Sequence, residues 1–123
     1  MTSAENVESD VRLWLTQNWD PTADLIEWRG LLADSGWGCP SWPQDWHGRG
    51  LPLTADAIVK KVFSEIGAVG VAAGVSMYLV APTLLEWGND DQKQRFLRPI
   101  LTGEDKWCQL FSEPGAGSDL AGL

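Results

Sequence analysis

The residues of this sequence that are best suited to bind a polar ligand lie near its end. An apolar run, residues 107–111, is followed by Ser-Glu-Pro-Gly-Ala-Gly-Ser-Asp at residues 112–119. Glycines leave backbone amides unshielded and permit positive φ, so two glycines beside a serine can form a concave set of N–H donors for a phosphate or carbonyl oxygen. The pattern predicts a strand that leads into a loop able to approach such a ligand closely.

The glycines of this loop fit none of three familiar motifs. A dinucleotide-binding fingerprint that starts at Gly115 would need Gly or Ala at position 120, where Leu120 stands. The Gly-Lys-Ser/Thr of a P-loop does not follow, and Ser118 lacks the flanking glycines of a nucleophile elbow. Taken alone, residues 112–119 are equally well explained as a turn in which Asp119 caps a helix.

Three segments together resemble the acyl-CoA dehydrogenase family. Residues 112–119 match, without interruption, its flavin-binding signature, in which a strand ending in Thr- or Ser-Glu-Pro leads to Ala-Gly-Ser-Asp. Residues 87–104 resemble the segment that precedes this strand, with Asp-Gln-Lys, then Phe-Leu, then Leu-Thr-Gly-Glu. Residues 42–50 resemble a family loop that ends in glycines, except that His47 stands in place of the first glycine of a pair.

The resemblance implies an all-α fold with a short continuation. Residues 1–105 would form the N-terminal helical domain of the acyl-CoA dehydrogenase fold, and residues 106–123 the start of its central β domain with the flavin-binding motif. The family's general base is a carboxylate, usually Glu, in a helical bundle beyond residue 123. No catalytic residue is therefore assigned in this sequence.

The resemblance also implies an activity and a cofactor. Family members remove hydrogens from the α and β carbons of an acyl-CoA thioester and pass the electrons to FAD. By position, the expected FAD-binding residues are Gln109, Phe111, Ser112, Gly117 and Ser118. The expected substrate-binding residues are Ser118, at the CoA portion, and Tyr78, Ala81 and Pro82, because the family places its acyl tail against the helix that corresponds to residues 69–87.

Partners follow from the same resemblance. An electron-transfer flavoprotein or a similar acceptor is expected to reoxidise the flavin, and the complete protein is expected to be a homo- or hetero-oligomer. Two other interpretations stay open. The chain is either a non-catalytic subunit or interaction module that docks on a full-length relative, or part of an acyl-CoA oxidase-like flavoenzyme in which oxygen reaches the reduced ring.

Composition limits the class of protein. The 123 residues are 44% hydrophobic and 10% aromatic, which is typical of a globular domain. A net charge of -8 argues against binding to nucleic acid or to an anionic membrane. The start of the chain is acidic and polar, unlike a secretory signal. Cys39 and Cys108 are far apart in sequence, so we interpret them as reduced thiols of a cytoplasmic protein without a bound metal.

Apolar residues recur at helical spacing through most of the chain. The first predicted helix ends at about residue 17. Together with their caps, the other four span about residues 21–36, 54–67, 69–87 and 89–103. Gly36, Gly67 and Gly103 are expected to end three of them, and Asn89 or Asp90 to begin the last. In the second helix, the residues expected to face inward are Leu25, Trp28, Leu31 and Leu32.

The stretch 69–87 and the aromatic residues each have a structural interpretation. This stretch is apolar on all sides, which predicts a helix surrounded by protein; Gly70, Gly74 and Pro82 argue against a membrane span.

Trp14 and Trp28 sit at helical core spacing and are expected to pack rather than bind a ligand. His47, the one histidine, has no nucleophile paired with it in sequence and is expected to be solvated or hydrogen-bonded.

Overall fold

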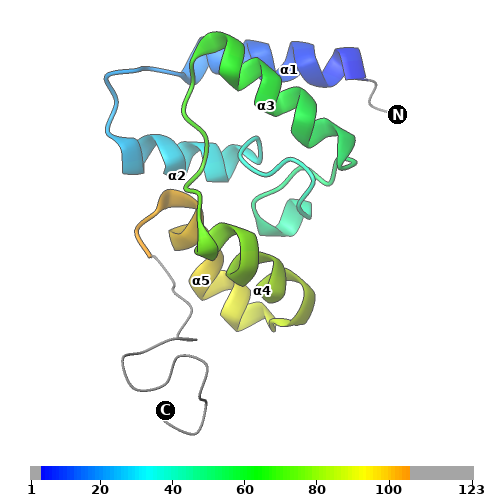
Figure 1. Cartoon of the computed structure of the whole chain (residues 1–123), viewed down its shortest axis with the longest axis vertical. Coiled ribbons are helices and arrows are strands. Elements are labelled where there is room, and N and C mark those ends of the chain that lie inside the picture. The colour runs from blue at the N-terminus through cyan, green and yellow to red at the C-terminus, as the bar shows by residue number, and fades with distance from the viewer. Residues whose placement is uncertain (1–3, 106–123) are drawn as a thin grey trace, which may run out of the picture.

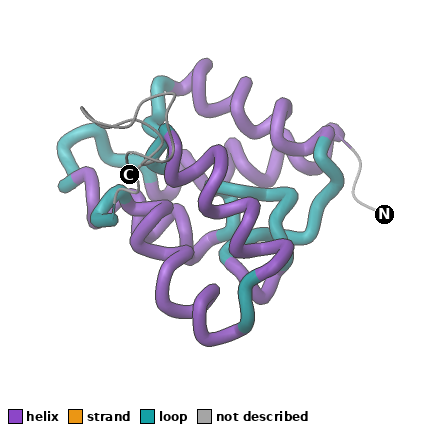
Figure 2. The backbone as a smooth tube through the Cα atoms, turned by 60° about the horizontal axis from the view of Figure 1, so that its bottom comes forward, coloured by secondary structure: helices purple, strands orange, loops and turns teal. Residues whose placement is uncertain are grey.

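The computed structural model describes residues 4–105, which fold as helices joined by loops. Its elements are α1 (Ala4–Asn18), α2 (Leu25–Ser35), the 3₁₀ turn η1 (Gln44–Trp46), α3 (Thr54–Ile66), the π-helical turn η2 (Ser76–Val80), α4 (Ala81–Trp87) and α5 (Asp90–Thr102). No strand occurs within the described range (Figure 2). The predicted all-helical fold is confirmed for this part of the chain, and the predicted start of a β domain lies outside it.

The helices are arranged as two pairs with α2 between them. Figure 1 shows α1 beside α3 at one end of the molecule and α4 beside α5 at the other, and the two helices within each pair are in contact. Trp28 and Leu32 of α2 join a buried cluster with α1 and α3. On the opposite side of α2, Ala33 packs with Leu101 of α5. One helix therefore connects both halves of the core.

The Arg98 side chain of α5 lies directly over Gly30 of α2. A Cβ placed on Gly30 of α2 would lie 2.8 Å from the guanidinium of Arg98 on α5. That guanidinium donates to both carboxylate oxygens of Asp34, each at 3.1 Å, and so holds α5 against α2. Because the pair is partly exposed, its contribution to stability is small, and the apolar contact beneath it does most to fix the helices.

Several helix ends occur where the sequence predicts them. Gly36, Gly67 and Gly103 follow α2, α3 and α5 with φ between 82° and 85°, the left-handed region that glycine adopts without steric cost. At the start of α5, Asn89 accepts a hydrogen bond from the Gln92 amide at 2.8 Å, and the Gln92 side chain accepts one from the Asn89 amide at 3.0 Å. This capping box confirms the predicted start of α5.

The second helix is shorter than predicted, and fewer of its leucines are buried. It begins at Leu25 rather than near residue 21, because the Asp24 carboxylate caps it by accepting from the Glu27 amide at 3.0 Å. Trp28 and Leu32 are buried as expected, but Leu25 and Leu31 are 46% and 44% exposed. Leu25 is the first residue of the helix and Leu31 lies on its flank, so neither belongs to the two packed faces.

The predicted helix over residues 69–87 is only partly formed. Helical structure begins at η2, and the segment before it is irregular. Here backbone carbonyls are taken by side chains of α2: the indole of Trp28 donates to Val69 O at 2.7 Å, and Arg29 donates to Gly70 O at 3.1 Å. These bonds replace the intrahelical ones, and Gly74, at φ 115°, turns the chain into η2.

Burial of this region also differs from the expectation. The structure leaves Val75, Tyr78, Leu79 and Trp87 exposed by 37%, 70%, 47% and 81%. Nothing within residues 4–105 covers this face. An all-round apolar sequence predicts that a helix is enclosed, but not which elements enclose it.

Trp14 and Trp28 pack against each other in the cluster formed by α1, α2 and α3, as predicted. The ring of Trp28 is 5.5 Å from that of Trp14 and 4.8 Å, edge to face, from that of Trp19. Such tilted and edge-on pairs suit the charge distribution of aromatic rings. The packing role predicted for Trp14 and Trp28 is confirmed.

Two adjacent leucines of α2 provide a test of this arrangement. Leu32 is fully buried between α2 and the pair α1 and α3, whereas Leu31 is 44% exposed. We expect Leu32→Ala to lower the free energy of unfolding by about 2–5 kcal/mol, because it leaves a cavity in the core. Leu31→Ala should lower it by less than about 1 kcal/mol. Urea denaturation of both variants checks this, and equal losses would contradict the orientation of α2 in the structure, in which Leu32 is buried and Leu31 is partly exposed.

Candidate functional site

The expected site residues fall partly outside the described structure. Gln109, Phe111, Ser112, Gly117 and Ser118, the expected FAD contacts, all lie beyond residue 105. Their assignment stays a prediction. The site that residues 4–105 do show is a cavity next to the segment expected to face the acyl chain.

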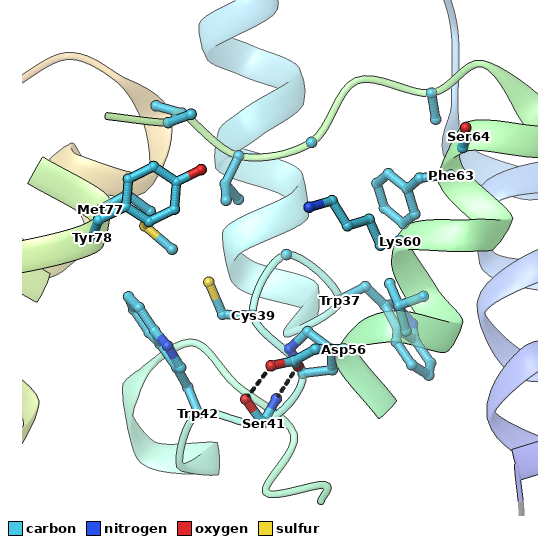
Figure 3. Close-up of a pocket in the computed structure, with 18 residues that line it drawn as sticks. Trp37, Cys39, Ser41, Trp42, Asp56, Lys60, Phe63, Ser64, Met77 and Tyr78 are labelled. Carbon is cyan, nitrogen blue, oxygen red and sulfur yellow. Dashed lines mark hydrogen bonds between the residues drawn. The ribbon is translucent and has the colours of Figure 1, made fainter. Parts of the chain in front are cut away.

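The cavity has a volume of about 540 Å³ and lies among three parts of the chain. One wall is the loop after α2, another is the face of α3, and the third is the segment that runs from residue 68 into η2 (Figure 3). The larger side chains that line it are Trp37, Trp42, Lys60, Phe63, Met77 and Tyr78. Its size lies within the range of roughly 300–1,000 Å³ that is common for small-molecule sites.

The polar floor of the cavity is built from Ser41 and Asp56. The Asp56 carboxylate, on α3, accepts from the Ser41 hydroxyl at 2.7 Å and from the Ser41 backbone amide at 3.1 Å (Figure 3). Both carboxylate oxygens are thus occupied by the loop. This contact fixes the loop to α3 and so holds two walls of the cavity together.

The loop that carries Trp42 is held in a tight turn. The amides of Gly48 and Gly50 donate to Pro43 O at 3.0 Å and to Trp42 O at 2.8 Å. A Cβ on Gly48 would lie only 2.0 Å from the Trp42 carbonyl oxygen, so only glycine fits there. His47 adopts φ 69°, in the left-handed region that glycine favours, so the departure from the family pattern keeps a glycine-like backbone.

Burial shifts the pKa of two side chains of the loop after α2, Cys39 and His47. Desolvation, assisted by the Asp56 charge, raises the pKa of the Cys39 thiol well above its usual range. The thiol is therefore protonated at neutral pH and is a poor nucleophile. Half-burial lowers the pKa of His47; the charge of Asp34 opposes this shift, and that of Arg98 adds to it. His47 is therefore mainly neutral at pH 7, without a nucleophile beside it among the described residues.

The expected substrate-binding residues of this part of the chain do not lie together. Tyr78 lines the cavity, and Figure 3 shows its ring at one side of it. Ala81 is fully buried in a core cluster with Leu97 and Ile100. Pro82 is exposed and does not line the cavity. The structure thus brings Tyr78 to the cavity, while the roles proposed for Ala81 and Pro82 stay predictions.

Sequence reasoning did not identify most of the cavity wall. Trp37 and Trp42 lie in a loop without helical periodicity, and Lys60 lies on the solvent-facing side of a helical pattern. The signal that does point to this region is the group of glycines and prolines at residues 36–50, which predicts a compact loop. That signal contains no information about which helix the loop covers.

Other classes of site find no support in the described residues. Within residues 4–105, no group of three or more His, Cys, Asp or Glu side chains is placed to hold a metal ion. No helix of the same range has the length and apolar character needed to cross a bilayer.

The tight turn provides a test of how the cavity wall is held. We expect Gly48→Ala to lower the free energy of unfolding by about 1–3 kcal/mol, because the new methyl group would displace the Trp42 carbonyl. Gly70→Ala is the matched control, since a Cβ there meets nothing within 4 Å and its φ is not positive. Chemical denaturation followed by tryptophan fluorescence compares the two, and equal stability of both variants would contradict the turn geometry.

Comparison with known proteins identifies the family. The model for the acyl-CoA dehydrogenase N-terminal domain matches residues 3–104. Acyl-CoA dehydrogenase IpdE1 of Mycolicibacterium smegmatis is 38% identical over an alignment that covers 100% of this chain and 36% of IpdE1. Acyl-CoA dehydrogenase FadE34 of Mycobacterium tuberculosis is 44% identical over 75% of this chain and 13% of FadE34.

A solved structure agrees with these sequence relatives. The crystal structure of the ChsE4-ChsE5 complex from Mycobacterium tuberculosis superimposes with a TM-score of 0.63 and 27% identity, over 98% of this chain and 33% of that one. The chain thus spans about a third or less of the length of these relatives. Because the family model matches most of its residues, this protein belongs to the acyl-CoA dehydrogenase family and contains the N-terminal domain of that family.

Proposed function

We propose that this chain forms the helical domain and the first flavin-binding strand of an FAD-dependent acyl-CoA dehydrogenase. The reaction removes hydrogens from the α and β carbons of an acyl-CoA thioester. The observation that carries the proposal is the cavity beside Met77 and Tyr78, because the acyl tail is expected along this same segment from the family resemblance.

The chemistry of the cavity suits a hydrocarbon chain. Phe63, Met77 and Trp42 present apolar surface to it, and each methylene that leaves water there contributes about 0.8 kcal/mol to binding. Met77 and Tyr78 come from the π-helical turn η2, a type of distortion that is frequent at functional sites. The cavity would thus bind and align the acyl group, while no residue of this chain is proposed as the catalytic base.

The flavin half of the proposal rests on residues 107–119. FAD, when bound, supplies the redox chemistry, and the protein supplies donors and orientation. Gln109 and Phe111 share one face of the predicted strand, and Ser112 lies where that strand ends. Gly117 and Ser118 supply an unshielded amide and a hydroxyl, which are the groups that bind a pyrophosphate.

The partners of this protein are also part of the proposal. Acyl-CoA is the proposed substrate, and an electron-transfer flavoprotein or a similar carrier is the proposed acceptor. The matching crystal structure is that of a complex, which supports the proposal that this protein acts within a homo- or hetero-oligomer. The exposed apolar side chains of η2 and α4 also suit a role inside a larger assembly.

The chain by itself is expected to retain little FAD. One strand and one loop offer only a few of the donors that a dinucleotide needs, and binding must also offset the lost freedom of both partners, which costs at least several kcal/mol. We expect the purified chain to lose its flavin absorbance on dialysis. A roughly equimolar yellow cofactor that survives dialysis would show that this chain has a complete FAD site.

The role of Ser118 can be measured in a complete holoprotein that contains this domain. We expect Ser118→Val to weaken FAD binding by about 1–3 kcal/mol, because it removes a hydrogen bond at the phosphates and adds bulk. Ser118→Thr introduces a side chain of nearly the same shape as Ser118→Val does but keeps the hydroxyl, so it should retain most of the affinity lost in Ser118→Val. FAD titration of the apo forms compares them. If Ser118→Val bound FAD as tightly as the unmodified protein, Ser118 would be removed from the site.

A further inference from the structure

A positively charged side chain lines the cavity, and the dehydrogenase proposal gives it no role. Within the described residues, the charged side chains that line it are Lys60 and Asp56, both from α3. Figure 3 shows the Lys60 amine extending into the space, across the cavity from Tyr78. The two side chains thus mark opposite sides of a largely apolar space.

Lys60 and Asp56 differ in whether they have a partner. Asp56 accepts two hydrogen bonds from Ser41. Lys60 forms no ion pair with any residue in the range 4–105, although Lys61, the next residue, pairs with Glu65 at 3.8 Å. Among residues 4–105, the cavity thus has an ammonium group without an ion-pair partner at one side and a hydrogen-bonded carboxylate on its floor.

An ammonium group beside apolar walls attracts a ligand of matching shape. Such a ligand has a hydrocarbon part for Phe63, Met77 and Trp42 and an anionic group within reach of the Lys60 amine. The Asp56 carboxylate has both oxygens occupied by Ser41 and offers no donor to an anionic end, so Lys60 is the charged group of the cavity wall that can pair with it. Tyr78, which is 70% exposed, lies where the other end would leave the cavity.

We propose that the acyl group received by this cavity ends in a carboxylate, remote from the thioester, that pairs with Lys60. This inference rests on the proposed function, because it assumes that the acyl chain passes Tyr78. The substrate class is then the mono-thioester of a dicarboxylic acid, and Lys60 determines specificity without taking part in the chemistry.

Binding to the full chain tests this without flavin or turnover. The probes are the monomethyl ester of octanedioic acid, whose capped end stands in for the thioester, and methyl octanoate, which lacks the carboxylate. Tryptophan fluorescence reports binding, since Trp37 and Trp42 lie in the cavity wall. We expect the carboxylate probe to bind roughly three- to tenfold more tightly, a modest preference because the Lys60 amine is exposed and screened.

Variants identify the residue that is responsible. Lys60→Met should remove the preference, Lys60→Arg should keep it, and the matched control Lys61→Met should leave it unchanged, with circular dichroism confirming the fold of each. The proposal is overturned if the unmodified chain binds the two probes equally or binds neither, or if Lys60→Met keeps the preference. Because no FAD is present, these outcomes are separate from those of the flavin experiments.

Discussion

Burial of α2 on two opposite faces is the constraint on which the described structure depends. Trp28 and Leu32 enter the cluster formed with α1 and α3, while Ala33 packs with Leu101 of α5 on the other face. Each helix pair would expose its apolar surface if α2 were absent, because neither pair contacts the other through its own core residues. Removing this surface from water is the main favourable term that joins the two halves.

The same helix places the walls of the cavity. Side chains of α2 bind the carbonyls of Val69 and Gly70, and the Ala72 amide donates to Leu101 O at 2.9 Å, so the segment before η2 crosses the molecule between the two helix pairs. The loop after α2 is fixed from the other side by Asp56. The cavity is the space that remains between these two irregular segments and α3.

The side chains that carry both proposals come from helical elements on two sides of the cavity. Met77 and Tyr78 belong to η2 and Lys60 belongs to α3. The irregular segment that leads into η2 lies between these elements and completes the wall. A site held in this way needs little rearrangement when a ligand binds, which favours affinity.

What the sequence determines by itself is mostly local. Some features depend on interactions within a few residues and can be predicted without knowledge of the fold. They are the glycine caps, the capping box at Asn89 and the helical spacing of Val62 or Leu97. The flavin-binding signature is likewise a local sequence pattern. The tertiary structure alone decides that residues 69–74 are not helical, contrary to the prediction, because the carbonyls of Val69 and Gly70 bind Trp28 and Arg29, about forty positions earlier in the chain. It also decides that Lys60 and Tyr78 face the same cavity, since contacts between distant segments carry no signal in local periodicity.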